Sequence, residues 1–130
     1  MSHSAPPICL LDDDSSFLKS VSRLLASDRL PALAFQHAVD LLAHAREHPV
    51  RLAVLDVCMP DAHGLDVQAQ LRGISPEIQV ILMSGLDDSR VRETALQRGA
   101  LAFFTKPFED EPFLALVRQA LASDLPPLQS

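Results

Sequence analysis

The chain alternates, five times over, between a short continuous run of apolar residues and a segment whose apolar residues recur at helical spacing. The runs cover residues 8–11, 32–35, 52–55, 80–83 and 101–104. Continuous apolar runs of this length suit strands that are buried on both faces, as in a parallel sheet. The pattern therefore predicts five strands, each followed by a helix.

The helical segments carry their own face and boundary signals. A short third helix is expected at about residues 65–71. In the other helices the expected inward positions are Phe17, Val21, Leu24 and Leu25; Ala38, Leu41, Leu42 and Ala45; Val91, Ala95 and Leu96; and Phe113, Leu114, Val117 and Leu121. Ser15 or Ser16 is expected to cap the first helix, and Asp87 or Asp88 the fourth. The third helix should end near Gly73 and the fourth at Gly99.

The chain length of 130 residues predicts one domain. We expect it to cover residues 6–123, with residues 124–130 as a C-terminal tail or the start of a linker because they include Pro126 and Pro127. Five βα units with short connections predict an α/β fold of the doubly wound (βα)5 class, in which helices cover both faces of a parallel sheet. In such sheets ligands bind at the carboxyl ends of the strands.

Charge and hydropathy narrow the function classes. The formal net charge of −6 argues against direct nucleic-acid binding by this domain, because phosphate contacts need clustered Lys and Arg. No apolar run approaches the roughly 20 residues of a membrane span, and the N-terminus lacks the pattern of a signal peptide. A cytoplasmic protein without membrane association is therefore expected.

Cysteine and histidine give no metal-site pattern. Cys9 and Cys58 make neither a disulfide framework nor a zinc site, and Cys9 is expected to be a small buried residue. His44 and His48 have helical i, i+4 spacing, for which a solvated helix face is the favoured interpretation over a metal site.

Polar residues lie at the ends of four predicted strands. They are Asp12, Asp13 and Asp14 after the first strand, Asp56 after the third, Ser84 after the fourth and Lys106 after the fifth. An acidic run after one strand is commonly a turn or a helix cap, and capping is the role expected for Asp14. The convergence of the other residues at one edge of the sheet indicates a site.

The residue types in this set indicate phosphoryl chemistry. Two carboxylates about 4 Å apart repel each other by roughly 4 kcal/mol at an effective dielectric constant of 20, so a cation is expected. Oxygen ligands without Cys or His side chains favour Mg²⁺. A carboxylate beside Mg²⁺, a lysine and a hydroxyl suits phosphoryl transfer. The chain has no G-x-x-x-x-G-K-[ST] loop and no G-x-S-x-G elbow, which argues against a nucleotide-binding protein or a serine hydrolase.

Four sequence blocks resemble the signature of receiver domains (CheY-like) of bacterial two-component response regulators. The blocks are residues 10–14 (LLDDD), 55–61 (LDVCMPD) with 64–65 (GL), 83–85 (MSG) and 105–108 (TKPF). They occur in the family's order and spacing, and the resemblance covers residues 6 to 123. It implies the flavodoxin-like strand order 2-1-3-4-5.

The resemblance also implies roles for individual residues. Asp56 would be the phosphorylation site. Asp13 would bind Mg²⁺ directly and Asp12 through water, with Asp56 and the backbone carbonyl of Cys58 completing the protein ligands.

The remaining site residues would act on the phosphoryl group. Ser84 resembles the hydroxyl residue that contacts this group, and Lys106 the lysine that pairs with it. Phe103 occupies the position of the family's rotating aromatic residue, so Ser84 and Phe103 would form the switch. A plain core phenylalanine is the alternative for Phe103. The Lys106-Pro107 peptide bond is expected to be cis, as in the family.

Together these points predict a switch rather than a turnover enzyme. A sensor histidine kinase would phosphorylate Asp56, and the change would be read on the face formed by the fourth helix, fifth strand and fifth helix, through a homodimer or an output domain beyond this chain. Two alternatives stay open. A degenerate receiver could act only as a constitutive interaction module, and a metal-dependent phosphatase could use Asp56 as its nucleophile.

Overall fold

A computed structural model describes residues 6–122 as five strands that alternate with five helices. The elements are β1 (Ile8–Leu11), α1 (Ser15–Ser27), β2 (Ala32–Phe35), α2 (Ala38–Glu47), β3 (Leu52–Asp56), α3 (Gly64–Ile74), β4 (Gln79–Ser84), α4 (Ser89–Gln97), β5 (Ala102–Thr105) and α5 (Asp110–Ala122). The tail expected at residues 124–130 lies outside the described residues.

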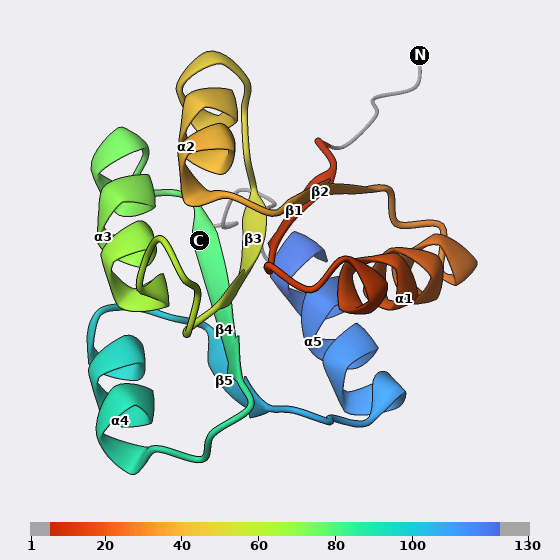
Figure 1. Cartoon of the computed structure of the whole chain (residues 1–130). Coiled ribbons are helices and arrows are strands. Elements are labelled where there is room, and N and C mark those ends of the chain that lie inside the picture. The colour runs from red at the N-terminus through yellow and green to blue at the C-terminus, as the bar shows by residue number, and fades with distance from the viewer. Residues whose placement is uncertain (1–5, 123–130) are drawn as a thin grey trace, which may run out of the picture.

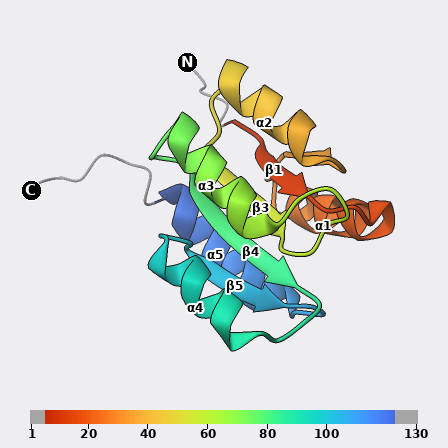
Figure 2. The ribbon, with the colours of Figure 1, turned by 60° about the vertical axis from the view of Figure 1, so that its left-hand side comes forward.

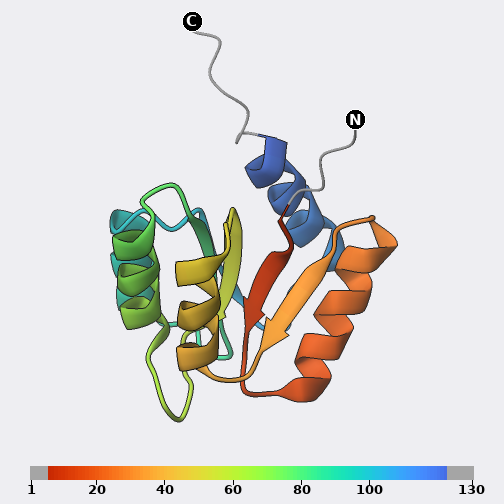
Figure 3. The same cartoon turned by 90° about the horizontal axis from the view of Figure 1, so that it is seen from above.

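The strands form one parallel sheet in the order β2-β1-β3-β4-β5, which confirms the predicted topology. Helices α2, α3 and α4 cover one face and α1 and α5 the other, on the left and right of the sheet in Figure 1. The turned views in Figures 2 and 3 show the same three layers. The order reverses between β1 and β3, so the carboxyl ends of these two central strands flank the expected ligand site.

Alternate residues of each central strand enter the two cores. In β3, Ala53 and Leu55 pack with α2 and α3, whereas Leu52 and Val54 pack with α1 and α5. All four are fully buried, as the apolar run predicts. Cys9 is also buried in β1, in agreement with the sequence.

Several local predictions were wrong. Neither Ser15 nor Ser16 caps α1. The cap is Asp14, which confirms the capping role expected for it, and its carboxylate accepts hydrogen bonds from the backbone N–H groups of Ser16 and Phe17. Leu96 was expected to face inward but is 45% exposed. The inward pair of α4 is Val91 and Ala95, and Leu96 lies about 100° further round the helix.

The edge strands also differ from the prediction. β2 is not buried on both faces: Leu33 and Ala34 are exposed, because β2 pairs only with β1. β5 begins one residue later than expected, at Ala102, and Leu101 lies before it. The third helix ends at Ile74, which confirms the predicted end near Gly73.

Other boundary predictions are confirmed. Asp88 caps α4 through hydrogen bonds to the N–H groups of Arg90 and Val91. Gly99 follows α4 with a φ of 96°, a conformation that favours glycine at a helix end. The Lys106-Pro107 peptide bond is cis.

A buried amide ties α3 to α4. The side chain of Gln68 on α3 is fully buried, and its Nε2 donates to the carbonyl oxygens of Ala95 at 3.2 Å and Arg98 at 3.5 Å. Both acceptors belong to the C-terminal end of α4, where the Ala95 carbonyl also accepts from the Ala100 N–H at 2.9 Å. The hydrogen bonds therefore fix this end of α4 to α3.

Candidate functional site

The sheet gathers the predicted site residues at the carboxyl ends of its strands. Asp56 is the last residue of β3 and pairs in register with Met83, so Ser84 lies one residue further along the neighbouring strand. Asp12 directly follows β1, and Lys106 directly follows β5. In a parallel sheet these ends share one edge, which is why residues far apart in the sequence meet here.

Three carboxylates form the centre of the site. Oxygen atoms of Asp12, Asp13 and Asp56 all lie within 4.8 Å of one another. Asp12 is 1% and Asp56 5% exposed, whereas Asp13 is exposed at the mouth of the site. Among residues 6–122, this is the one group of three acidic, histidine or cysteine side chains placed to hold a metal ion.

Lys106 is the basic member of the cluster. Its Nζ donates to Asp12 Oδ2 at 2.6 Å and lies 3.6 Å from Asp56 Oδ1. The ammonium also lies 4.2 Å from the centroid of the Phe17 ring. One positive charge thus faces three carboxylates, which leaves the cluster with an excess of negative charge.

The electrostatics of Asp56 reflect this excess. Burial, followed by the negative charge of Asp12, raises the pKa of Asp56 to about 6, although the nearby Lys106 ammonium opposes the shift. A bound cation would favour the ionised form, because its charge offsets both the desolvation and the repulsion between the carboxylates.

The loop after β3 packs tightly against Asp56. The backbone N–H of Gly64 donates to the Val57 carbonyl at 2.8 Å, and Cys58 forms an antiparallel bridge with His63. A Cβ atom on Gly64 would lie 2.7 Å from the carbonyl oxygen of Asp56. The missing side chain therefore lets α3 begin directly against the strand end that carries Asp56. The Cys58 side chain is exposed, and the role of its carbonyl stays a prediction.

Ser84 and Phe103 lie on neighbouring strands next to the cluster. The Ser84 side chain is buried, and its Oγ accepts a hydrogen bond from the Leu86 N–H at 3.0 Å, which leaves the hydroxyl proton free to donate elsewhere. Phe103 is 9% exposed and packs into the core beneath α4. The ring thus occupies an inward position, and its switching role stays a prediction.

Two neighbours of the predicted site were not found from the sequence. Arg92 on α4 places its guanidinium 5.1 Å from the Phe103 ring centroid, and its Nη2 donates to Asp87 Oδ1 at 2.5 Å and Thr105 Oγ1 at 3.3 Å. Phe17 on α1 faces Lys106. A helical periodicity gives the face of a residue but not the strand-end side chain that it meets, so neither contact could be anticipated.

The histidine pair shows no metal-site geometry. The rings of His44 and His48 stack with centroids 4.5 Å apart on α2, and neither belongs to a group of three candidate ligands within residues 6–122.

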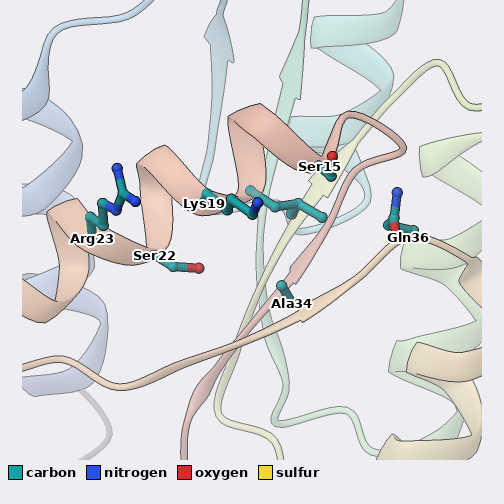
Figure 4. A pocket seen from close by; sticks show the side chains of 7 residues that line it. Ser15, Lys19, Ser22, Arg23, Ala34 and Gln36 are labelled. Atoms are coloured by element: carbon teal, nitrogen blue, oxygen red, sulfur yellow. The ribbon is translucent and has the colours of Figure 1, made fainter.

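A surface hollow of about 410 Å³ lies between α1 and β2 (Figure 4). Its lining residues are Ser15, Leu18, Lys19, Ser22, Arg23, Ala34 and Gln36. None of them is a predicted site residue. We therefore take the strand-end cluster, with its buried carboxylates and lysine, as the functional site.

No helix within residues 6–122 is both long and apolar enough to cross a membrane.

Comparisons with known proteins agree with this geometry. The family model described as the response regulator receiver domain matches residues 8–118. Response regulator protein TodT of Pseudomonas putida is 39% identical over 121 residues, covering 93% of this chain and 53% of TodT. Nodulation protein W of Bradyrhizobium diazoefficiens is 32% identical over 117 residues, covering 90% of this chain and 52% of that protein. The chain thus spans about half the length of these two relatives.

Solved structures give the same result. The beryllofluoride-activated DrrB receiver domain superposes with a TM-score of 0.81 at 33% identity, covering 89% of this chain and 97% of that one. The beryllofluoride-activated NtrC4 receiver domain dimer gives a TM-score of 0.86 at 26% identity, covering 90% and 97%. The sequence match over residues 8–118, the strand order and the strand-end acidic cluster lead to one conclusion. The chain belongs to the receiver domain family of two-component response regulators.

Proposed function

We propose that this receiver domain accepts a phosphoryl group on Asp56 from the phosphohistidine of a sensor histidine kinase. The observation that carries the proposal is the meeting of Asp56 with two further carboxylates and Lys106 at one edge of the sheet. Asp56 is the central residue because it is buried at the end of a middle strand and contacts both kinds of charge.

Mg²⁺ is the cofactor that the cluster suits best. Asp12, Asp13 and Asp56 would hold it, together with the backbone carbonyl of Cys58. The oxygen-only donor set and the uncompensated negative charge support this assignment. When bound, the ion supplies charge neutralisation for the carboxylates and for the incoming phosphoryl oxygens.

The chain's own residues perform the transfer. A carboxylate oxygen of Asp56 attacks phosphorus in line; the O–P bond forms as the P–N bond of phosphohistidine breaks, and its electron pair stays on the imidazole nitrogen. Lys106 moves from Asp12 toward the phosphoryl oxygens and pairs with them, and the Ser84 hydroxyl donates a hydrogen bond to the same group. Later attack of water on the acyl phosphate returns Asp56 to its free state.

The domain acts in this proposal as a switch, not as a turnover enzyme. The constitutive interaction module predicts no response to a phosphoryl donor or its analogue. The phosphatase predicts continuous turnover of a chromogenic phosphate ester. The acidic cluster and the single positive charge of Lys106 beside Asp56 favour the switch over the module, because neither is needed for passive binding.

Incubation with acetyl phosphate and Mg²⁺ is expected to add one phosphoryl group to the chain, on Asp56. Intact-mass measurement detects the addition, and peptide mapping of the acyl phosphate gives its position. Chelation of Mg²⁺ should prevent the labelling, because the charges of the carboxylates then oppose the approach of an anionic donor. Labelling at another carboxylate, or labelling that persists after chelation, contradicts the proposal.

The output is proposed to be read on the face formed by α4, β5 and α5. Ser84 lies next to Asp56, and the buried Phe103 lies on the neighbouring strand beneath Arg92 of α4. A phosphoryl group that draws the Ser84 hydroxyl away from its contact with Leu86 would loosen the loop before α4. The altered face would pair with a second copy or contact an output domain. The activated NtrC4 receiver dimer supports the first outcome, and the greater length of TodT, of which the match covers 53%, supports the second.

Beryllofluoride is expected to shift the backbone amide resonances of residues 90–99 in nuclear magnetic resonance spectra. Ser84→Ala and Phe103→Ala should each reduce these shifts, because they remove the donor hydroxyl and the buried ring that lies beneath α4. Ser20→Ala removes an exposed hydroxyl on α1 and serves as the control. Unchanged shifts in both switch variants would show that this coupling is wrong. Size-exclusion chromatography with light scattering tests the dimer.

A further inference from the structure

Lys106 is held from two sides. On one side its ammonium meets Asp12 at 2.6 Å and Asp56 at 3.6 Å, and on the other it lies 4.2 Å from the centroid of the Phe17 ring. The ammonium thus lies between the carboxylates and an aromatic face. The lysine side chain is 21% exposed, so the ring takes the place of part of its water shell.

The ring of Phe17 is itself fixed in place. Phe17 lies in the first turn of α1, where its backbone N–H donates to the capping carboxylate of Asp14 at 3.2 Å. Its ring meets Phe108 edge to face, with centroids 6.1 Å apart. Phe108 follows Lys106 by two residues, so the strand end that carries the lysine also supports the ring.

We propose that Phe17 is a positioning residue for Lys106 and keeps the ammonium inside the acidic cluster, ready for the phosphoryl group. The inference rests on the proposed function of Asp56. An aromatic face attracts an ammonium group through its quadrupole, and the attraction is stronger where water is partly excluded. Lysine is a long, flexible side chain, and ordering it at the moment of phosphorylation would weaken the capture of the phosphoryl group. With Phe17 present, that ordering is completed when the domain folds.

A purely packing role for Phe17 predicts a different result. Leucine keeps an apolar side chain between α1 and α5 but has no aromatic face, whereas tyrosine keeps the face. If Phe17 only packs, Phe17→Leu and Phe17→Tyr should change Lys106 equally. If it positions the ammonium, tyrosine should preserve the effect and leucine should remove it.

The lysine content of the chain makes the contact directly measurable. Lys19 and Lys106 are its two lysines, so lysine labelled with ¹³C at Cε gives two sets of signals. Lys19 is exposed on α1 and serves as the internal reference. The Hε protons of Lys106 should lie upfield of those of Lys19, because they sit over the face of the ring. Phe17→Leu should remove the upfield shift, and Phe17→Tyr should retain it.

Beryllofluoride affinity, followed by amide shifts near Asp56, tests the consequence. Phe17→Leu should weaken binding about twofold to tenfold, the range expected for losing one ordered side chain. Phe17→Tyr should restore it. Phe104→Leu is the matched control, because Phe104 belongs to the same aromatic group with Phe108 and Phe113 but is not the ring over Lys106.

The Hε shifts and the beryllofluoride affinities together separate failure of this inference from failure of the proposed function. Equal Hε positions for Lys106 and Lys19 in the unaltered protein, or equal beryllofluoride affinity of Phe17→Leu and the unaltered protein, overturns the positioning role. If the unaltered protein takes up no beryllofluoride although Lys106 shows the upfield shift, the phosphoacceptor role of Asp56 fails, and the positioning role that rests on it falls too.

Discussion

Metal-free Asp56→Asn is expected to be more stable than the unaltered domain at pH 7, by about 3 kcal/mol in free energy of unfolding, and to accept no phosphoryl group. The pKa of Asp56 is raised from 3.8 to about 6 in the folded state, a difference of about two units at about 1.4 kcal/mol each. At pH 7 the carboxylate is ionised in both states, and folding bears the cost of its burial beside Asp12. Asparagine has nearly the same shape, and it neither ionises nor attacks phosphorus.

The stability gained by Asp56→Asn should depend on pH. Because the folded pKa is the higher one, the folded state binds more protons than the unfolded state between about pH 4 and 6, and the cost of the ionised carboxylate disappears as pH falls through this window. The stability advantage of Asp56→Asn should therefore be present at pH 7 and lost near pH 4. Urea unfolding in the presence of a chelator at the two pH values measures it.

An exposed acid provides the control for this experiment. Asp66→Asn makes the same chemical change on the surface of α3 and should alter the unfolding free energy little. Added Mg²⁺ should stabilise the unaltered protein more than Asp56→Asn, by mass action on a site that exists only when folded. An Asp56→Asn variant that is no more stable than the unaltered protein at pH 7 would contradict the cost attributed to burying the ionised Asp56 carboxylate beside Asp12.

Gly64→Ala is expected to destabilise the domain by about 1–3 kcal/mol and to impair phosphorylation of Asp56. A Cβ atom here would lie 2.7 Å from the Asp56 carbonyl oxygen and 2.8 Å from Val57 Cα. Both are backbone atoms, so neither can rotate away, and the strand end that carries Asp56 would have to move. Thermal unfolding and acetyl phosphate labelling measure the two effects.

Gly73→Ala is the matched control in the same helix. A Cβ atom on Gly73 meets nothing within 4 Å, and residue 73 lies inside α3. Alanine should stabilise the helix by about 0.5–1 kcal/mol, because it loses less backbone entropy on folding than glycine. The two substitutions should therefore have opposite signs. Similar effects on stability would show that the close approach at Gly64 is not what restricts this position.

The sequence was sufficient for the topology and for the residues of the central cluster. The apolar runs predicted the five strands, and the family resemblance implied their order. The strand ends of a parallel sheet share one edge, so Asp12, Asp56 and Lys106 could be brought together from their positions. The runs could not distinguish edge from central strands, which is why the exposure of Leu33 in β2 was missed. An apolar run records composition, but burial depends on which neighbours cover it.

The features that the sequence could not supply depend on side-chain geometry across elements. Asp14 was expected to cap a helix, and it is chosen over Ser15 and Ser16 because its backbone is extended, with φ −91° and ψ 105°, directly before the first helical residue. Nothing in the helical pattern marks Phe17 or Arg92 as special. Their partners, Lys106 and Phe103 respectively, lie in or next to β5, on a different element of the fold. Gln68 resembles a surface residue in the pattern of α3 but is fully buried, because the end of α4 covers it.

The Gln68 amide has a mechanical consequence for α4. One buried hydrogen bond, to Ala95, and one partly buried hydrogen bond, to Arg98, hold the C-terminal end of this helix, whereas its N-terminal half is held to β5 by the partly exposed Arg92. Breaking a buried hydrogen bond costs more than rearranging an exposed one, because the freed groups find no water. If the loop after β4 moves, α4 would therefore pivot about its C-terminal end, which Gln68 holds in place. The largest displacement would fall on Ser89 and Arg90, at the N-terminal end of α4.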